Sequence, residues 1–338
     1  MKISFKLLIL IFISFLSLMI AVGIGSVNIP INQIINIISH NLFNTPLDSD
    51  ISASTASIIW NIRLPRSIMA FIVGAGLAAS GTVMQSILRN PLASSYTLGV
   101  SSGASLGAAI MIVFGINIPL MGAFGLPFVG FIGGLITVLL VMAMTSKIDK
   151  SLSNQTIILV GMVFSLFVNA LLTLFFALAR QFMEQLILWQ LGSFAGQNWS
   201  HVGITLIITV ISIFLLMRYS QEMDIMTFGE DQAQSIGVNL KKIKILLISI
   251  ASLITGSAVA FVGIIGFVDL IAPHVVRKIF GTTHKLVIPT SALFGGTFMV
   301  LSDLIGRVLV SPSELPVGAV TALIGAPFFA YIFFKKRG

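Results

Sequence analysis

Apolar runs long enough to cross a bilayer recur along almost the whole chain. Nine of them approach the ~20 residues that a membrane-spanning helix needs. They lie at about 5–25, 67–88, 95–115, 125–145, 156–178, 200–217, 245–265, 286–306 and 316–334. Another apolar segment, 267–281, is shorter and is interrupted by charged residues. Counting it as a short span predicts an all-α integral membrane protein with about ten transmembrane helices.

Lysines and arginines test this count, because the cytoplasmic side of a membrane protein carries most of its basic residues. With ten spans, fifteen of the 19 fall on the side of the N-terminus. The four on the other side are Arg63, Arg66, Arg180 and Arg307. Without a span at 267–281, the basic residues at 335–337 would move to the side that has few. The charges therefore favour ten spans with both the N- and the C-terminus in the cytoplasm.

Two polar segments connect these spans. Residues 25–61 lie outside in this topology and contain an amphipathic stretch, INQIINII, that we expect on the membrane surface. Residues 218–244 form the longest cytoplasmic connection. The first apolar run resembles a signal peptide, but it exceeds the ~7–15 apolar residues of such signals and lacks a clear cleavage site, so we expect a retained helix. The chain is predicted to be one transmembrane domain over 1–338.

Composition supports a lipid environment and excludes several kinds of site. The chain is 57% hydrophobic and 9% charged, whereas a soluble domain is about a quarter charged. The net charge of +8 then reflects topology, and we expect no nucleic-acid partner. The absence of cysteine excludes disulfides, thiolate metal sites and a lipidated N-terminal cysteine.

Glycines recur at every fourth position in two of the predicted spans. Gly99, Gly103 and Gly107 form one such row, and Gly130 and Gly134 form another. Rows of this kind let helix backbones approach closely in lipid. They indicate either helix packing alone or small side chains that leave room for a wide path.

Signals for chemistry are weak. No phosphate-binding G-x-x-x-x-G-K-[ST] motif occurs, so any ATP is bound by a partner. The G-x-S-x-G motif at 99–103 belongs to hydrolases only when it follows a strand, and here it opens a membrane helix. The histidines are scattered, and we predict no catalytic residue and no metal site. Asp269 is the one ionisable residue well inside an apolar run, and Asp303 and Glu184 lie nearer the outer ends. An ion-coupled carrier normally has more ionisable residues at membrane depth, so the sequence argues against that class.

The cytoplasmic stretch FGEDQAQSIG at 228–237 has the pattern of a short capped helix. Glu230 and Asp231 stand where a helix N-terminus favours negative charge, and Gly237 suits a C-terminal cap. A short, stiff helix projecting from a membrane body indicates a docking element. The alternative is a solvated turn.

The outer arginines are the second unusual feature. In RLPR, residues 63–66, Pro65 predicts an extended Leu64 and the first turn of the next helix, which would hold both arginines at its mouth. Asp303 and Arg307 are one helical turn apart and are expected to pair. These arginines form either a basic patch for an acidic partner or a set of side chains that extend to lipid headgroups.

Several ordered motifs together resemble a known family. They are RLPR (63–66), GxxLAASGxxxQ (74–85), RNPLASSYTLGVSSGA (89–104), GEDQAQSIGV (229–238), GFVDLIAPHVVR (266–277) and DxxxR…ELPVG…GAP (303–327). Over about 55–334 the chain is similar to the permease subunits of binding-protein-dependent ABC importers for iron-siderophores, haem and vitamin B12. The resemblance implies the ten-helix fold of the vitamin B12 importer permease. One departure is Asp269, where many members have glycine.

The resemblance also implies roles for individual residues. Residues expected to dock the extracellular binding protein are Arg63, Arg66 and Arg307. Residues expected in the coupling helix that contacts the ATPase are Gly229, Glu230, Asp231, Ala233 and Gly237. Residues expected in the loop that closes the cytoplasmic mouth are Ser153, Asn154 and Gln155.

The implied assembly lies in the bacterial cell membrane. It contains two permeases, identical or paralogous, two cytoplasmic ATPase subunits that bind ATP and magnesium, and an extracellular substrate-binding lipoprotein. The permease itself would be no enzyme and would bind no cofactor. Iron-siderophore is favoured as the substrate because such systems are numerous, with haem and vitamin B12 as alternatives. An ion-coupled secondary transporter is the more distant alternative.

Overall fold

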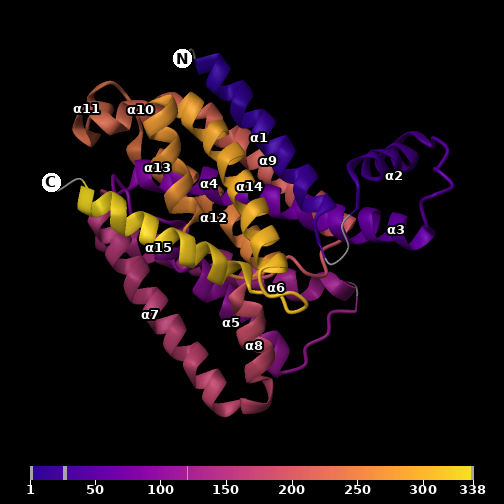
Figure 1. The fold of residues 1–338 in the computed structure, drawn as a ribbon. Helices are drawn as coiled ribbons and strands as arrows, with labels where there is room; N and C mark the ends of the chain where they lie inside the picture. The colour runs from indigo at the N-terminus through magenta and orange to yellow at the C-terminus, as the bar shows by residue number, and fades with distance from the viewer. Residues whose placement is uncertain (1–2, 26–28, 120, 336–338) are drawn as a thin grey trace.

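The computed structural model describes residues 3–25, 29–119 and 121–335. All regular elements in this part of the chain are helices (Figure 1). The ten that match the predicted segments are α1 (Ile3–Gly23), α4 (Leu64–Ile87), α5 (Val100–Val113), α6 (Gly125–Ile148), α7 (Asn154–Leu178), α9 (Trp199–Arg218), α12 (Leu240–Val262), α13 (Val268–Phe280), α14 (His284–Val308) and α15 (Val317–Lys335). Lys2, Lys336 and Arg337, which contributed to the charge count, lie outside the described residues.

Seven helices in the described part are long and apolar enough to cross a membrane, and α5 and α15 are shorter apolar helices. Further short helices lie in the connections. They are α2 (Ile31–Phe43), α3 (Ala53–Ser57), α8 (Met183–Leu191), α10 (Ser220–Phe228) and α11 (Glu230–Ser235). The structure is that of an all-helical, multi-pass membrane protein.

Helix α4 lies at the centre of the bundle, where α12, α13 and α14 surround it (Figure 1). In its most apolar stretch 89% of the residues are buried. Glycines allow the close contacts: a Cβ atom added at Gly74 would lie 2.3 Å from the carbonyl oxygen of Gly295, and one at Gly81 would overlap the backbone of Asp269. Because lipid does not drive helices together, such backbone contact is a main source of their association.

Helices α5 and α6 pack through the predicted glycine rows. A Cβ atom at Gly103 would lie 2.5 Å from the carbonyl oxygen of Gly133, and one at Gly107 would lie 2.7 Å from that of Val129. The packing interpretation of these glycines is therefore confirmed. The G-x-S-x-G motif opens α5 after a short 3-10 turn rather than after a strand, so the geometry of a hydrolase elbow is missing there.

The prediction for Leu64 was wrong. Its backbone is helical, with φ −66° and ψ −52°, and α3 runs through a π-helical turn, Ile58–Arg63, directly into α4. Proline normally breaks a helix because it lacks an N–H group and its ring meets the carbonyl one turn earlier. The wider π turn before Pro65 changes this spacing, so the helix continues.

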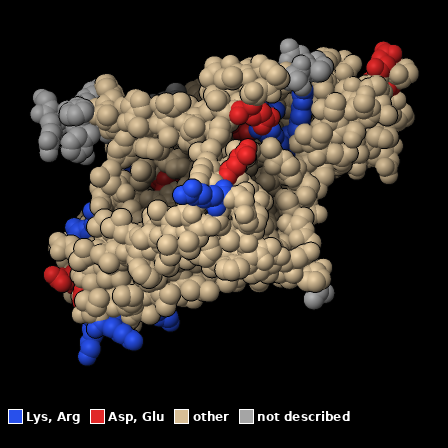
Figure 2. Space-filling model, turned by 90° about the horizontal axis from the view of Figure 1, so that it is seen from below, with Lys and Arg blue, Asp and Glu red and all other residues tan. Residues whose placement is uncertain are grey.

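The surface seen in Figure 2 is almost entirely uncharged, and the few Lys, Arg, Asp and Glu side chains gather in small groups. Helix α7 lies at the margin of the bundle (Figure 1), and only 28% of its most apolar stretch is buried. The predicted amphipathic stretch lies in α2, which buries Ile34 and Ile37 against neighbours such as Val22 and Ile59.

Candidate functional sites at the two ends of the helix bundle

Arg66 is the centre of a charged cluster near the last turn of α14. Its Nε and Nη2 atoms donate to the carboxylate of Asp303 at 2.8–3.1 Å, and its Nη1 donates to Glu314 at 2.9 Å. Arg307 completes the predicted one-turn ion pair, with its Nε 3.2 Å from Asp303. Forked contacts of this kind are stronger than neutral hydrogen bonds.

The other contacts of this cluster reach α1. Arg63 donates to the carbonyl oxygens of Val22 and Gly23 at 3.1 and 3.0 Å, and Arg307 donates to that of Ala21 at 2.9 Å. These carbonyls belong to the last turn of α1, where a cation satisfies unpaired acceptors and the helix dipole together. Arg63 and Arg307 thus bind the end of α1, and Arg66 binds carboxylates, instead of extending to lipid headgroups.

We call Arg63, Arg66, Arg307, Asp303 and Glu314 the arginine cluster. Three cations face two carboxylates, so the cluster keeps a surplus positive charge. Most of it is buried: Arg63 is 5% and Asp303 2% exposed. The Glu314 side chain is 44% exposed and is the accessible member. The arginines therefore form an internally paired group and not a freely exposed rim.

The predicted short helix is present at the other end of the bundle as α11. Gly229 has φ +143° and Gly237 has φ +93°, backbone angles that residues with a Cβ atom rarely adopt. The N–H groups of Gly237 and Val238 donate to Gln234 and Ala233, which is the paired bonding of a Schellman cap. The glycine brackets are therefore confirmed as the local cause of this helix.

One side of α11 is anchored and the other is free. Ala233 is completely buried among residues of the main hydrophobic cluster. Phe228 and Ile236, which flank the helix, are 77% and 67% exposed. Large apolar side chains held in the open beside a rigid helix are typical of an interaction surface.

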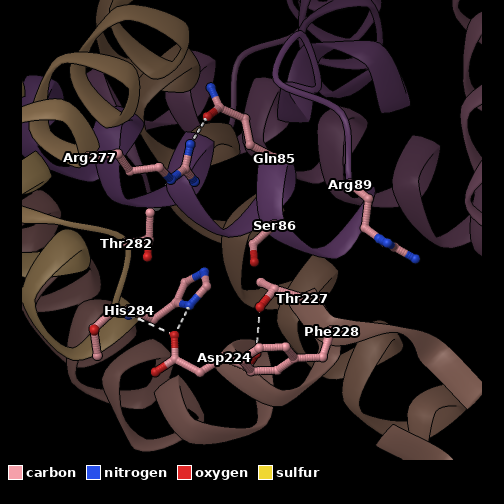
Figure 3. A pocket seen from close by; sticks show the side chains of 10 residues that line it. Gln85, Ser86, Arg89, Asp224, Thr227, Phe228, Arg277, Thr282 and His284 are labelled. Carbon is pink, nitrogen blue, oxygen red and sulfur yellow. Dashed lines mark hydrogen bonds and ion pairs between the residues drawn. The ribbon is translucent and has the colours of Figure 1, made fainter. Parts of the chain in front are cut away.

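Helix α10, which precedes α11, borders a cavity of about 590 Å³, and two long-range contacts lie beside this cavity (Figure 3). Asp224 on α10 accepts hydrogen bonds from Nδ1 and the backbone N–H of His284 at 2.5 and 3.0 Å. Arg277 on α13 donates to Gln85 Oε1 at 2.5 Å and to the Thr82 carbonyl on α4. The first contact attaches α10, which leads into α11, to the start of α14, and the second joins α13 to α4.

The predicted gate residues lie at the end of the loop between α6 and α7 (Ser153) and in the first turn of α7 (Asn154 and Gln155). Asp149 accepts hydrogen bonds from the backbone N–H groups of Ser151 and Ser153 and from the hydroxyls of Ser151 and Thr156. The bonds from Ser151, followed by those from Ser153, hold the pKa of Asp149 well below its usual range. Ser153 caps α7, and Gln155 on its first turn is exposed.

Lys244 on α12 joins this loop to α11. Its Nζ atom lies 2.8 Å from both carboxylate oxygens of Glu230 and 2.9 Å from the Leu152 carbonyl and from Asn154 Oδ1. The structure thus brings two predicted sites together through a residue that the sequence reasoning used only for topology. The available signal was its position between Ile243 and Ile245 at the start of an apolar run.

Asp269 on α13 is buried, 3% exposed, beside α4. One carboxylate oxygen accepts a hydrogen bond from Ser94, and the backbone carbonyl accepts one from Gln85. The contact with α4 requires glycine at 81. Among the described residues, no group of three or more His, Asp or Glu side chains is arranged to hold a metal ion.

Comparisons with known proteins agree with this architecture. The profile described as the FecCD transport family matches residues 9–335. YvrB of Bacillus subtilis, an uncharacterized ABC transporter permease protein, is 40% identical over 326 residues, covering 96% of this chain and 92% of YvrB. The cobalamin import system permease protein BtuC of Halobacterium salinarum is 37% identical over 290 residues, covering 86% of this chain and 77% of BtuC.

Among solved structures, an inward-facing conformation of a metal-chelate type ABC transporter matches with a TM-score of 0.83. It is 29% identical, and the match covers 98% of this chain and 99% of that one. Sequence and fold thus agree over almost the full length. The chain belongs to the FecCD transport family and is a permease of an ABC importer.

Proposed function

We propose that the chain forms, with an identical or paralogous permease, the membrane channel of an importer for iron-siderophores. In this proposal ten helices cross the bacterial cell membrane and both termini are cytoplasmic. The α11 end then faces the cytoplasm and the arginine cluster faces outward. The asymmetric distribution of lysine and arginine supports this orientation.

The assembly would also contain two cytoplasmic ATPase subunits, which bind ATP and magnesium, and an extracellular binding lipoprotein. The sparsely buried outer face of α7 supports a second permease, because Leu159, Val163 and Leu166 are each more than half exposed. A two-fold axis between the subunits would place the path between them. Movement of the coupling helices would switch the path between outward- and inward-open states.

The proposal rests mainly on the structure of α11 and its surroundings. The helix is bracketed by two glycines with positive φ, buried through Ala233, and flanked by exposed Phe228 and Ile236. An ATPase groove that accepted this surface would move the permease body together with the helix. Gly229, Glu230, Asp231, Ala233 and Gly237 are the proposed coupling residues, and Ser153, Asn154 and Gln155 are the proposed gate.

The arginine cluster is the proposed docking site for the binding protein. Arg66 already binds one exposed carboxylate, that of Glu314, so an acidic side chain of a partner can take the same position. The surplus positive charge of Arg63, Arg66 and Arg307 would favour such an exchange and guide the approach of an acidic surface.

An iron-siderophore is the proposed substrate, supported by the metal-chelate type of the similar solved transporter. Vitamin B12 is the second candidate, favoured by the 37% identity with a cobalamin permease. Haem remains the third candidate within the family. Purifying the binding protein that docks on this permease, and identifying the compound it carries by mass spectrometry, would decide among them.

Reconstitution tests the proposed coupling. The permease, its ATPase and the loaded binding protein are placed in liposomes, and uptake is measured with and without ATP inside the vesicle. Uptake is expected only with ATP. Deleting 230–236, or the change Gly237→Pro, should leave ATP hydrolysis without uptake. ATP-independent uptake driven by a proton or sodium gradient would instead support a secondary transporter.

A second experiment tests docking. Reversing Arg63 and Arg66 to glutamate should abolish uptake and binding-protein capture while the chain still inserts. Arg180→Glu is the control, because Arg180 carries the same charge on the same proposed side and is exposed. Unchanged capture by the double variant would remove the docking proposal and leave the ATPase coupling standing.

A further inference from the structure

The side chain of Lys244 connects segments that are far apart in the chain. Leu152 lies 92 residues away from it and Glu230 lies 14 residues away. Four elements meet there: α11 through Glu230, α12 through Lys244 itself, the α6–α7 loop through Leu152, and the start of α7 through Asn154. We call these four residues the lysine site.

All hydrogen-bonding capacity of Lys244 is used inside the protein. An ammonium group has three N–H donors, and it meets three acceptor groups: one carboxylate, one carbonyl and one amide oxygen, all within 2.9 Å. The side chain is 0% exposed. Water therefore does not contact the Lys244 side chain while these partners are in place.

The loop side of this site is preformed. Leu152 adopts φ +54°, an uncommon left-handed conformation for a residue with a Cβ. Asp149 stabilises the turn through its bonds to Ser151 and Ser153. The Leu152 carbonyl is consequently held in place for Lys244, and the loop should move as one unit with it.

Displacing α11 therefore has a consequence for the loop. If Glu230 moved away alone, a buried cation would lose the one carboxylate partner it has among the described residues, which is unfavourable. If Lys244 followed Glu230, it would pull on Leu152 and on Asn154 at the first turn of α7. Motion that preserves these contacts carries the start of α7 along with α11.

We propose that Lys244 is a positioning residue that transmits displacement of α11 to the α6–α7 loop and the start of α7. This inference rests on the proposed function, in which an ATPase moves α11. It adds to that function a physical link between the coupling helix and the gate, made by one buried side chain.

The test measures loop position in the assembled permease–ATPase complex in nanodiscs. Because the chain has no cysteine, spin labels can be placed at Lys150→Cys in the loop and at Lys285→Cys on α14, both exposed positions. The distance between them is recorded by pulsed electron paramagnetic resonance, without nucleotide and with trapped MgATP. The unsubstituted lysine site should give a clear nucleotide-dependent shift, which Lys244→Met should abolish.

Glu230→Gln is the second variant, because Glu230 is partly exposed and its replacement is the milder change. It should reduce the shift, and adding it to Lys244→Met should have no further effect, since residues acting through one contact are not additive. Lys241→Met is the control: it removes an exposed lysine from the same helix and should leave the shift unchanged. Melting temperatures identify variants that do not fold. If Lys244→Met does not fold, the result for Glu230→Gln decides the test.

The outcomes separate the two proposals. A full shift in both Lys244→Met and Glu230→Gln would overturn the proposed role of Lys244 and leave the proposed ATPase coupling intact. If the protein with an unsubstituted lysine site binds ATP but shows no shift, the proposed coupling through α11 is contradicted. The proposed role of Lys244, which rests on that coupling, is then contradicted as well. Loss of the shift in Lys244→Met and a reduced shift in Glu230→Gln, with folding and ATP hydrolysis retained, support the proposed role of Lys244.

Discussion

The arginine cluster and the lysine site both link separate segments of the chain, but they differ in charge balance and in exposure. Each contains a cation paired with a carboxylate: Arg66 and Asp303 are 237 residues apart, and Lys244 and Glu230 are 14 apart. Lys244 also donates to the backbone carbonyl of Leu152, 92 residues away. The arginine cluster has three cations for two carboxylates, and one of its acids is 44% exposed. The lysine site has one of each, and its cation is fully buried.

Because of this difference, a carboxylate of the arginine cluster can be exchanged for that of a partner, whereas the lysine site can only move as a whole. An exposed acid on a positively charged cluster can give way to another carboxylate at small cost, because exposed ion pairs contribute little. A buried, saturated cation has no such alternative. The first arrangement suits docking, and the second suits transmission of a displacement.

The largest effect is expected for Asp303→Asn. This change leaves Arg66 and Arg307 buried without their shared carboxylate, and it should lower the free energy of unfolding by about 3–5 kcal/mol. Denaturation of the purified protein in detergent would measure it. Asp50→Asn, at an exposed position, should have no effect. Equal stability of the two variants would show that Asp303 does not stabilise the cluster.

A smaller loss is expected for Glu230→Gln. Glu230 is 27% exposed and serves one cation, whereas Asp303 is 3% exposed and is shared by two, so the loss should be about 1–2 kcal/mol. The same denaturation assay applies, with Asp231→Asn as the control because Asp231 is exposed on the same helix. A loss as large as that of Asp303→Asn would remove the distinction drawn between the two sites.

Glu314→Gln should hardly change stability, by less than about 1 kcal/mol, because the side chain is largely in solvent. It should raise the affinity for the binding protein, since Arg66 loses a competing carboxylate. Surface-immobilised permease would give this affinity. Weaker binding would mean that Glu314 belongs to the docking surface itself and is not displaced from it.

The smallest effect concerns pH. The lowered pKa of Asp149 keeps it ionised from about pH 8 to about pH 5, since even an unperturbed aspartate titrates near pH 4. Its contribution to the loop is therefore constant over this range and is lost only in stronger acid. Protection factors of the Ser151 and Ser153 amides from hydrogen exchange should stay constant, and those in Asp149→Ala should be low throughout. A decline beginning near neutral pH would contradict the assignment.

Features determined by local sequence could be predicted. Hydropathy located nine of the ten helical segments, because each of these apolar runs is close to the length of a membrane-spanning helix. The distribution of basic residues favoured the tenth, at 267–281. Gly229 and Gly237 predicted α11 because the backbone conformations they adopt are rare in other residues. The Asp303–Arg307 pair followed from helical spacing alone.

Features that depend on distant contacts could not be predicted. The backbone of Leu64 follows a π turn rather than the usual restriction before proline. The burial of Arg63 depends on where α1 ends, and the partner of Arg66 lies 237 residues away. Lys244 was counted as one of many cytoplasmic lysines, because only the folded chain brings Leu152 and Glu230 to it.

Uptake by the purified permease in liposomes, alone and with its ATPase and binding protein, tests the central claim most directly. We predict no uptake by the permease alone and ATP-dependent uptake by the full assembly. Solute transport by the isolated permease, at the rate of the assembly and without ATP, would contradict the account.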